Sequence, residues 1–263
     1  MDLGLKDKSV IVLASSKGLG KATASQFAAE GARVFLASRD EDTLKKTAAE
    51  IRQTTGNSNV AYSVGDIKNY DSIKQLIAKV VSEHGTIDVL VNNAGGPPAG
   101  SFDDVDDDAW QHAFELNLLS FIRATREVLP YMREQGGGHI LNFASSSIKQ
   151  PIDGLILSNT FRAGITGFAK SMSQELAGDN ILINTIGPGR IGTDRVDHLD
   201  SVQSEKLDIP VEAVKEKAKR KIPIGRYGEP EEFARTAVFL CSQANTYITG
   251  QSLLVDGGMV KAL

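Results

Sequence analysis

Short runs of apolar residues alternate along the chain with longer segments in which apolar residues recur at helical spacing. Runs such as SVIVLA and IDVLVNN are almost continuously apolar, which is typical of strands covered on both faces. Periodic segments, for instance residues 18–30, 71–84 and 108–134, predict the covering helices. The pattern therefore predicts an α/β fold with a parallel, doubly wound sheet of seven strands and helices on both faces. The seven runs begin at Ser9, Arg33, Val60, Ile87, His139, Ile181 and Ser252.

The length of the chain favours a single domain. Its 263 residues are 41% hydrophobic, enough for one full α/β core, and no linker or repeat interrupts residues 1–263. The only long stretch without strand signals runs from Gly189 to about Tyr227. Because a connection of that length in a compact domain is usually functional, we expect a substrate lid at about residues 190–227.

Charge and cysteine content exclude several classes of function. The net charge of −4 gives no general attraction to phosphate backbones, so we expect no nucleic-acid partner. Cys241 is the only cysteine, which excludes an intrachain disulfide and fits a reducing compartment. The first apolar run is too short for a signal peptide or a membrane span, so we expect a cytoplasmic protein with no membrane partner.

A glycine-rich turn follows the first predicted strand. The sequence LASSKGLGKATASQFA opens a helix there, and Gly18 and Gly20 would let backbone N–H groups approach a pyrophosphate at the helix N-terminus. Glycines also occur at such turns for backbone reasons alone, so this loop by itself is weak evidence of a nucleotide site.

Other motifs stand at the ends of later strands. VNNAGG ends the fourth strand, Ser145 follows HILNFA, and IGPGRIGT follows the sixth strand. Asp66 ends the third strand, and Asn117 lies in the helix before the fifth. With these motifs in this order, the chain resembles the short-chain dehydrogenase/reductase family over essentially its whole length. Residues 223–258, PIGRYGEPEEFARTAVFLCSQANTYITGQSLLVDGG, are similar to the C-terminal signature of 3-oxoacyl-[acyl-carrier-protein] reductases.

The resemblance implies a Rossmann-type sheet with a nicotinamide dinucleotide lying across the carboxyl ends of the strands. It also implies a homotetramer, with interfaces along the Asn117 helix, the Ser158 helix and the segment GQSLLVDGG, where Phe168 and Met172 would otherwise be exposed. The cofactor-binding residues implied by the resemblance are Ser15, Ser16, Lys17, Gly18, Leu19, Gly20, Arg39, Asp66, Asn93, Ala94, Gly95, Arg162, Pro188, Gly189 and Ile191.

The end of the second strand indicates which dinucleotide binds. In the family an acidic residue there takes the ribose hydroxyls of NAD, but this chain has Ser38 followed by Arg39. A guanidinium can hold a 2′-phosphate with two aligned donors, and Lys17 could add a second charge, so NADP(H) is favoured over NAD(H). The alternative is that Arg39 is an ordinary exposed residue beside Asp40.

One position of the glycine-rich turn departs from the family. Where the family has Thr-Gly, this chain has Leu13 and Ala14. If the backbone needs a positive φ at Ala14, its methyl group costs about 1 kcal/mol, and cofactor affinity would be modest.

The predicted active-site helix departs further. The family uses a tyrosine as proton donor with a lysine four residues later, a serine about thirteen residues upstream of the tyrosine, and an asparagine that anchors a water. Asn117 and Ser145 match the asparagine and the serine, but counting from Ser145 puts Ser158 and Arg162 at the tyrosine and lysine positions. No tyrosine lies between residues 131 and 227, so a small shift of alignment cannot restore one.

These replacements leave two hypotheses about function. Ser158 is too weak an acid to replace a phenol, whereas Arg162 can still hydrogen-bond the nicotinamide ribose. Lys149 is an alternative proton source, although a solvated loop lysine is the simpler interpretation. The first hypothesis is a divergent NADP(H)-dependent reductase acting on a carbonyl or related compound, small or acyl-carrier-linked. The second is a nucleotide-binding protein without dehydrogenase turnover that serves as a sensor or partner subunit.

Three further features have plain structural interpretations. The acidic run FDDVDDDAW is best read as a helix start capped by Asp106, and the four histidines show no metal-ligand spacing, so we expect no metal site. The basic run VEAVKEKAKRKIP is usually a solvated helix face, although its place in the predicted lid would suit an acidic substrate or carrier protein.

Overall fold

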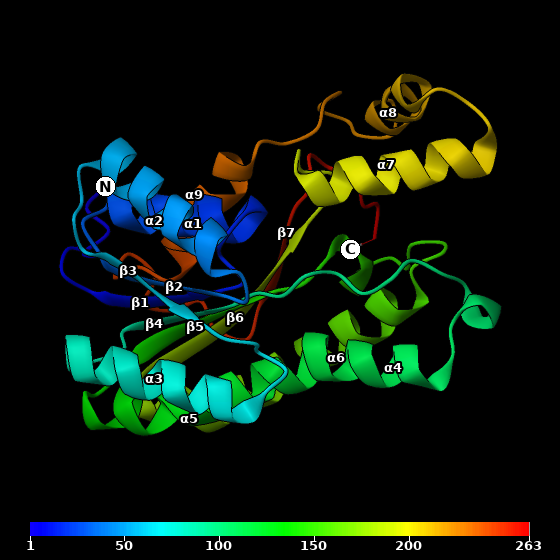
Figure 1. Cartoon of the computed structure of the whole chain (residues 1–263). Helices are drawn as coiled ribbons and strands as arrows, with labels where there is room; N and C mark the ends of the chain where they lie inside the picture. Colours follow the sequence, from blue (N-terminus) through cyan, green and yellow to red (C-terminus); the bar gives the residue numbers. More distant parts are fainter. Residues whose placement is uncertain (263) are drawn as a thin grey trace.

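The seven strands form one sheet in which every neighbouring pair is parallel, as the sequence predicts. The structure is a computed structural model that describes residues 1–262. The strand order is β3-β2-β1-β4-β5-β6-β7, with the crossovers expected of a doubly wound sheet (Figure 1). The strands are β1 (Ser9–Leu13), β2 (Arg33–Ser38), β3 (Val60–Val64), β4 (Val89–Asn92), β5 (Gly138–Phe143), β6 (Ile181–Pro188) and β7 (Ser252–Val255).

Two hydrophobic cores cover the faces of the sheet. Because successive side chains of a strand point to opposite faces, Val10 and Val12 of β1 enter one core while Ile11 and Leu13 enter the other. Figure 1 shows α1, α2 and α9 on one face of the sheet, where they cover the first core, and α3, α5 and α6 on the other face, where they cover the second. These helices are α1 (Gly18–Ala29), α2 (Glu41–Thr55), α3 (Tyr70–His84), α5 (Ser120–Glu134), α6 (Ile156–Leu176) and α9 (Pro230–Leu240).

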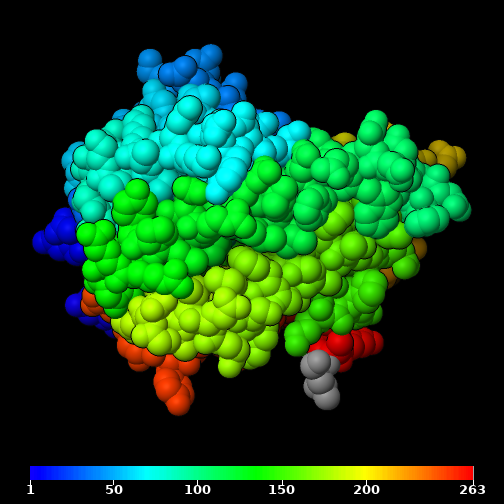
Figure 2. All heavy atoms as spheres, turned by 90° about the horizontal axis from the view of Figure 1, so that it is seen from below, coloured from blue at the N-terminus to red at the C-terminus, as the bar shows by residue number. Residues whose placement is uncertain are grey.

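The outer helical layer is more deeply packed than the sequence suggests. Figure 2 shows α3, α5 and α6 side by side on the face seen from below. Phe168 and Met172 of α6, which we expected to be exposed in a monomer, are partly buried against the second core. These two side chains are therefore partly exposed rather than fully exposed on this face.

The helix expected over residues 108–134 is interrupted at its middle. It consists of α4 (Asp107–Phe114), a π-helical turn η2 (Glu115–Leu119) and α5. A π turn inserts an extra residue without ending the helix, so it changes the direction of the side chains that it carries. The buried residue of this turn is Asn117.

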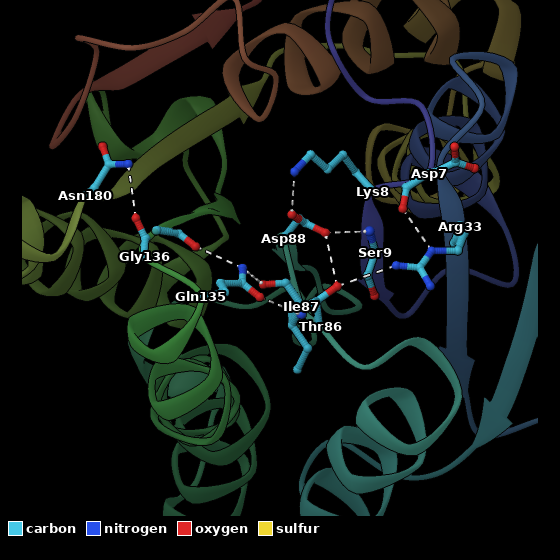
Figure 3. A network of polar contacts seen from close by, with 11 residues as sticks. Asp7, Lys8, Ser9, Arg33, Thr86, Ile87, Asp88, Gln135, Gly136 and Asn180 are labelled. Atoms are coloured by element: carbon cyan, nitrogen blue, oxygen red, sulfur yellow. Dashed lines mark hydrogen bonds and ion pairs between the residues drawn. The ribbon is translucent and has the colours of Figure 1, made fainter.

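Polar contacts connect the segments at the amino end of the sheet (Figure 3). Asp88 accepts hydrogen bonds from Lys8 Nζ at 2.9 Å and from the backbone N–H of Ser9 at 2.8 Å. Gln135 donates to the carbonyl of Ile87 at 2.7 Å and accepts from its N–H at 3.2 Å. These bonds satisfy backbone groups where β1 and β4 begin, at the opposite end of the sheet from the motifs described above.

The long stretch without strand signals contains two helices. They are α7 (Asp194–Leu207) and α8 (Val211–Lys219), which lie together beyond the carboxyl ends of the strands (Figure 1). Within residues 1–262, no helix combines the length and apolarity needed to cross a membrane. The remaining helical turns are η1 (Phe102–Asp104), η3 (Ser146–Ile148) and η4 (Ala177–Asp179).

Candidate active site

The sequence motifs meet at the carboxyl ends of four neighbouring strands. Parallel pairing aligns β1 with β4, β4 with β5 and β5 with β6, so the segments that follow these strands emerge side by side. A bond from Asn93 Nδ2 to the carbonyl of Ala14, 3.1 Å long, joins the segment after β4 to the segment after β1. The candidate site is built on this edge.

The glycine-rich turn has the backbone geometry that its sequence predicts. Ala14 has a φ of 46° and Gly18 a φ of 56°, so the turn does need positive φ at the alanine. A Cβ on Gly20 would lie 2.5 Å from the carbonyl oxygen of Ala14, so only glycine fits there. Helix α1 then begins after Lys17 with no side-chain cap and no acidic residue in its first turn, which leaves its first N–H groups available to an anion.

The end of β2 carries no free carboxylate. Ser38 accepts a hydrogen bond from Ser16 Oγ at 3.1 Å, and Arg39 is exposed. The neighbouring Asp40 caps α2 by accepting from the N–H of Thr43 at 2.7 Å, and its bonds to Thr43 lower the pKa of the Asp40 carboxyl. Asp40 is thus committed to the helix cap.

Asp66, beyond β3, likewise forms hydrogen bonds within its own loop. Its carboxylate accepts a hydrogen bond from the N–H of Lys68 at 2.9 Å, and its backbone carbonyl accepts from the N–H of Asn69. With Ala37, Gly65 and other residues it borders a shallow hollow between the ends of β2 and β3.

Asn117 reaches the same edge from the π turn. Its Nδ2 donates to the carbonyl of Gly95 at 2.8 Å, while its Oδ1 is buried without a partner among the described residues. Gly95 is itself exposed, and a Cβ added to it would meet nothing within 4 Å. An open space therefore lies over Gly95, with an unpaired acceptor beneath it.

Arg162 lies under this edge rather than at its surface. The side chain is 5% exposed, and its two terminal nitrogens donate to the carbonyls of Phe143 at 2.5 Å and Ala94 at 3.4 Å. Burial, with a smaller contribution from the charge of Arg195, lowers the pKa of Arg162 to about 10. Arg162 is therefore still a cation at neutral pH.

The two serines have different surroundings. Ser145, at the end of β5, is half-buried and accepts a hydrogen bond from the N–H of Ser147 at 3.1 Å. Ser158, in the first turn of α6, is half-buried, and its hydroxyl has no hydrogen bond to the described residues. Lys149 is exposed after η3, in agreement with the simpler interpretation of a solvated lysine.

The segment after β6 contributes backbone groups to the candidate site. Pro188 ends the strand, the N–H of Gly189 donates to the carbonyl of Val255, and Ile191 forms a bridge with Gly228. A Cβ on Gly189 would lie 2.6 Å from Asp256 Cβ, so glycine is required for this close approach.

Sequence reasoning missed several residues of this region. Asn159 donates to the carbonyl of Ile152 and accepts from its N–H, which ties the loop before α6 to the helix. Arg195, at the start of α7, donates to the carbonyl of Pro97 at 2.8 Å. Neither residue belongs to a motif with its own spacing, so only the folded chain shows its neighbours.

The acidic run behaves as a helix start. Asp106 caps α4 by accepting from the N–H of Ala109 at 2.9 Å, and Asp104 forms a capping box with Ser101. Across residues 1–262, no group of three or more histidine, cysteine, aspartate or glutamate side chains is arranged to hold a metal ion.

Comparison with known proteins decides the family. The sequence model described as "Enoyl-(Acyl carrier protein) reductase" matches residues 13–260. The chain belongs to the short-chain dehydrogenase/reductase family. Among its relatives is the 3-oxoacyl-[acyl-carrier-protein] reductase FabG of Thermotoga maritima, 35% identical over 97% of this chain and 99% of that protein.

Two further members of the family match the chain along its whole length. The uncharacterized oxidoreductase YvrD of Bacillus subtilis is 33% identical and covered completely, as is this chain. The crystal structure of L-sorbose reductase from Gluconobacter frateurii, complexed with NADPH and L-sorbose, has a TM-score of 0.94 at 33% identity, with both chains fully covered. The resemblance seen in the sequence is thereby confirmed as family membership.

We expect Ala14→Gly to stabilise the protein, because the turn holds Ala14 at positive φ, where a methyl group is strained. The gain in free energy of unfolding should be up to about 1 kcal/mol, since glycine's greater unfolded-state entropy offsets part of the relief. Urea denaturation measures it. The control is Ala22→Gly within α1, where the same change should cost about 1 kcal/mol. An equal loss of free energy of unfolding in the two variants would contradict the proposed strain at Ala14.

Proposed function

We propose that this short-chain dehydrogenase/reductase is an NADP(H)-dependent oxidoreductase acting on a carbonyl compound. The observation that carries the proposal is the open space over Gly95 beside the unpaired Oδ1 of Asn117, in a loop that the Asn93 bond joins to the turn before the uncapped α1. Both offer polar groups that a dinucleotide can satisfy. When bound, NADPH would supply the hydride for carbonyl reduction.

The residues at this edge fit such a cofactor. Backbone N–H groups from Gly18 onward would take the pyrophosphate, the hollow beside Asp66 would take one edge of the adenine, and the exposed Gly95 would lie under the nicotinamide side. Arg162 would support the backbone beneath the nicotinamide ribose, and its remaining N–H groups would donate hydrogen bonds to that ribose. We propose a cofactor-binding role also for the other residues that the family resemblance implies.

The preference for NADP(H) over NAD(H) rests on the end of β2. Ser38 is neutral, Asp40 is held as a helix cap, and the exposed Arg39 has no carboxylate within ion-pair distance among residues 1–262. A 2′-phosphate would meet one free guanidinium, and the nearby Asp40 carboxylate is turned to the N-terminus of α2. The relative from Gluconobacter, which was crystallised with NADPH, supports the same choice.

We predict that Arg39→Ala raises the dissociation constant for NADPH about tenfold and leaves that for NADH nearly unchanged, because only NADPH carries the phosphate that Arg39 would bind. Calorimetry measures both constants. Lys45→Ala, which removes another exposed cation on α2, is the matched control and should alter neither. Wild-type protein with equal affinity for the two cofactors would refute the preference.

We further propose that the site lacks the tyrosine and lysine pair of the family and carries Ser158 and Arg162 in its place. Tyr227 is no substitute, because its hydroxyl donates to Asp200, and burial together with that bond raises the pKa of Tyr227 to about 12. Ser145 and Asn117 would assist the substrate, while Ser158 offers no proton of useful acidity. A positioned acid typically contributes about 10² to 10⁴ in rate, so its loss slows catalysis without abolishing it.

The rival proposal is a cofactor-binding sensor or partner subunit without turnover. It is supported by the same substitution at Ser158 and by the buried, carbonyl-bound position of Arg162. Steady-state oxidation of NADPH with any member of a diverse carbonyl panel separates the two proposals. We favour the enzyme, because the open edge over Gly95 is retained beside Ser145 and Asn117.

The double change Ser158→Tyr with Arg162→Lys should raise ketone reduction by about 10²-fold or more, because it puts a phenol and an ammonium four residues apart on one face of α6. NADPH oxidation with a simple ketone measures the rate. The control, Ser158→Phe with Arg162→Lys, has the same bulk without the phenolic hydroxyl and should show no gain. Equal rates in the two double variants, or brisk wild-type reduction that Ser158→Ala abolishes, would contradict the assignment.

We propose that residues 190–227, which contain α7 and α8, form a lid. The substrate would enter beneath these two helices. Three contacts within this segment hold its parts together: Arg190 with Asp200, Tyr227 with Asp200 and Lys215 with Asp197. A small carbonyl compound and an acyl-carrier-linked substrate both remain candidates, the second because of the FabG relative and the basic run on α8.

We also propose a homotetramer. Tyr247 and Leu253 are 97% and 44% exposed, and β7, which carries Leu253, is the last strand of the sheet and leaves an unpaired edge. Light scattering at micromolar concentration should give four times the chain mass of 28.2 kDa. Leu253→Asp should lower that mass, whereas Val64→Asp, at an exposed residue on the opposite edge strand, should not. A monomeric wild type would overturn the proposal.

A further inference from the structure

Two arginines from different helices meet the loop that follows β4. Arg162 of α6 donates to the carbonyl of Ala94, and Arg195 of α7 donates to the carbonyl of Pro97. Between these carbonyls lies the exposed Gly95, whose own carbonyl takes the bond from Asn117. Both guanidinium groups therefore border the edge at which the proposed reaction would occur.

Arg195 lies close over the backbone of Gly96. A Cβ on Gly96 would be 3.1 Å from both Nε and Nη2 of Arg195 and 3.2 Å from its Cζ. The near-equal distances mean that the guanidinium faces this glycine with its plane, and a side chain there would push it away. The bond to Pro97 uses one terminal nitrogen, so other N–H groups of the half-buried Arg195 stay available.

Neither arginine has an acidic partner. Within residues 1–262, no carboxylate lies at ion-pair distance from Arg162 or Arg195, and the charge of Arg195 contributes to the lowered pKa of Arg162. The carboxylates near Arg195 on α7 are engaged elsewhere. Asp194 pairs with Lys17, Asp197 with Lys215, and Asp200 with Arg190. Two unpaired cations in a partly desolvated site are unfavourable unless an anion completes it.

We propose that Arg195, backed by the buried charge of Arg162, binds a carboxylate of the substrate. The preferred substrate class is then a free oxo acid, with its carboxylate within a few bonds of the carbonyl, rather than a neutral thioester or a simple ketone. A planar guanidinium holds a carboxylate with two parallel hydrogen bonds, which would also orient the carbonyl over the edge at Gly95. This inference rests on the proposed carbonyl chemistry and specifies its substrate.

The cofactor's pyrophosphate is the other anion that Arg195 could serve. The structure favours the substrate, because Thr193 is the residue of this segment that lies against Gly18 at the start of α1, whereas Arg195 turns toward Gly96 and Pro97. Pyrophosphate and a substrate carboxylate both present oxyanions to a guanidinium. The experiment therefore has to distinguish binding of the cofactor from binding of the substrate.

The test uses acetoacetate and its neutral analogue methyl acetoacetate, titrated calorimetrically into the full-length protein with saturating NADP⁺, which forms a ternary complex without turnover. We expect acetoacetate to bind at least about tenfold tighter than the ester. Arg195→Met should remove that advantage and leave the NADP⁺ dissociation constant within about twofold. Arg195→Lys should restore part of it, since the charge returns without the planar fork. The control Arg220→Met removes an exposed arginine after α8 and should change nothing.

Each other outcome counts against the proposal. It is overturned if acid and ester bind equally, if Arg195→Met binds acetoacetate like the parent, or if that variant loses NADP⁺ affinity to the same extent, which would assign Arg195 to the cofactor. A titration without NADP⁺ separates this test from the proposed function. If NADP(H) fails to bind the wild type, the cofactor assignment fails. Acetoacetate binding that depends on Arg195 in the cofactor-free protein would still support the anion site.

Discussion

Parallel pairing of β1 with β4 is the constraint on which the rest of the site depends. The register Val10↔Val89, Ile11↔Leu90 and Val12↔Val91 makes the two strands end together. The glycine-rich turn and the loop of Asn93 to Gly95 consequently leave the sheet side by side, and the Asn93 bond to Ala14 joins them. Loss of this register would separate the uncapped start of α1 from the open edge over Gly95.

A second constraint acts from beneath. Arg162 connects Phe143, the last residue of β5, to Ala94 in the loop after β4, so one buried guanidinium holds two adjacent strand ends. Its bonds to these two carbonyls satisfy N–H groups of the buried guanidinium, which explains how an arginine can be accommodated at this position. The same cation places a positive charge beneath the site. The chemistry of the site therefore depends on which anion binds above Arg162.

The π turn at Asn117 links helix geometry to the site. An uninterrupted helix through residues 107–134 would carry its side chains in a regular 3.6-residue rotation, and the extra residue of η2 changes that rotation at Asn117. The amide then reaches the carbonyl of Gly95 from below the loop. Periodicity indicated a helix over this segment but could not reveal the inserted residue, because apolar residues continue on both sides of it.

The sequence by itself determined the sheet, the order of its strands along the chain and the loops that carry chemistry, because strand burial, helical periodicity and turn residues are local signals. It also indicated the strain at Ala14, since a glycine-rich turn makes a known demand on φ. Only the tertiary structure decided that Arg162 is buried on two carbonyls and that Arg195 lies over Gly96 without a carboxylate partner in the described chain. Those features depend on contacts between residues up to 98 positions apart, and no local pattern of hydrophobic or charged residues encodes them.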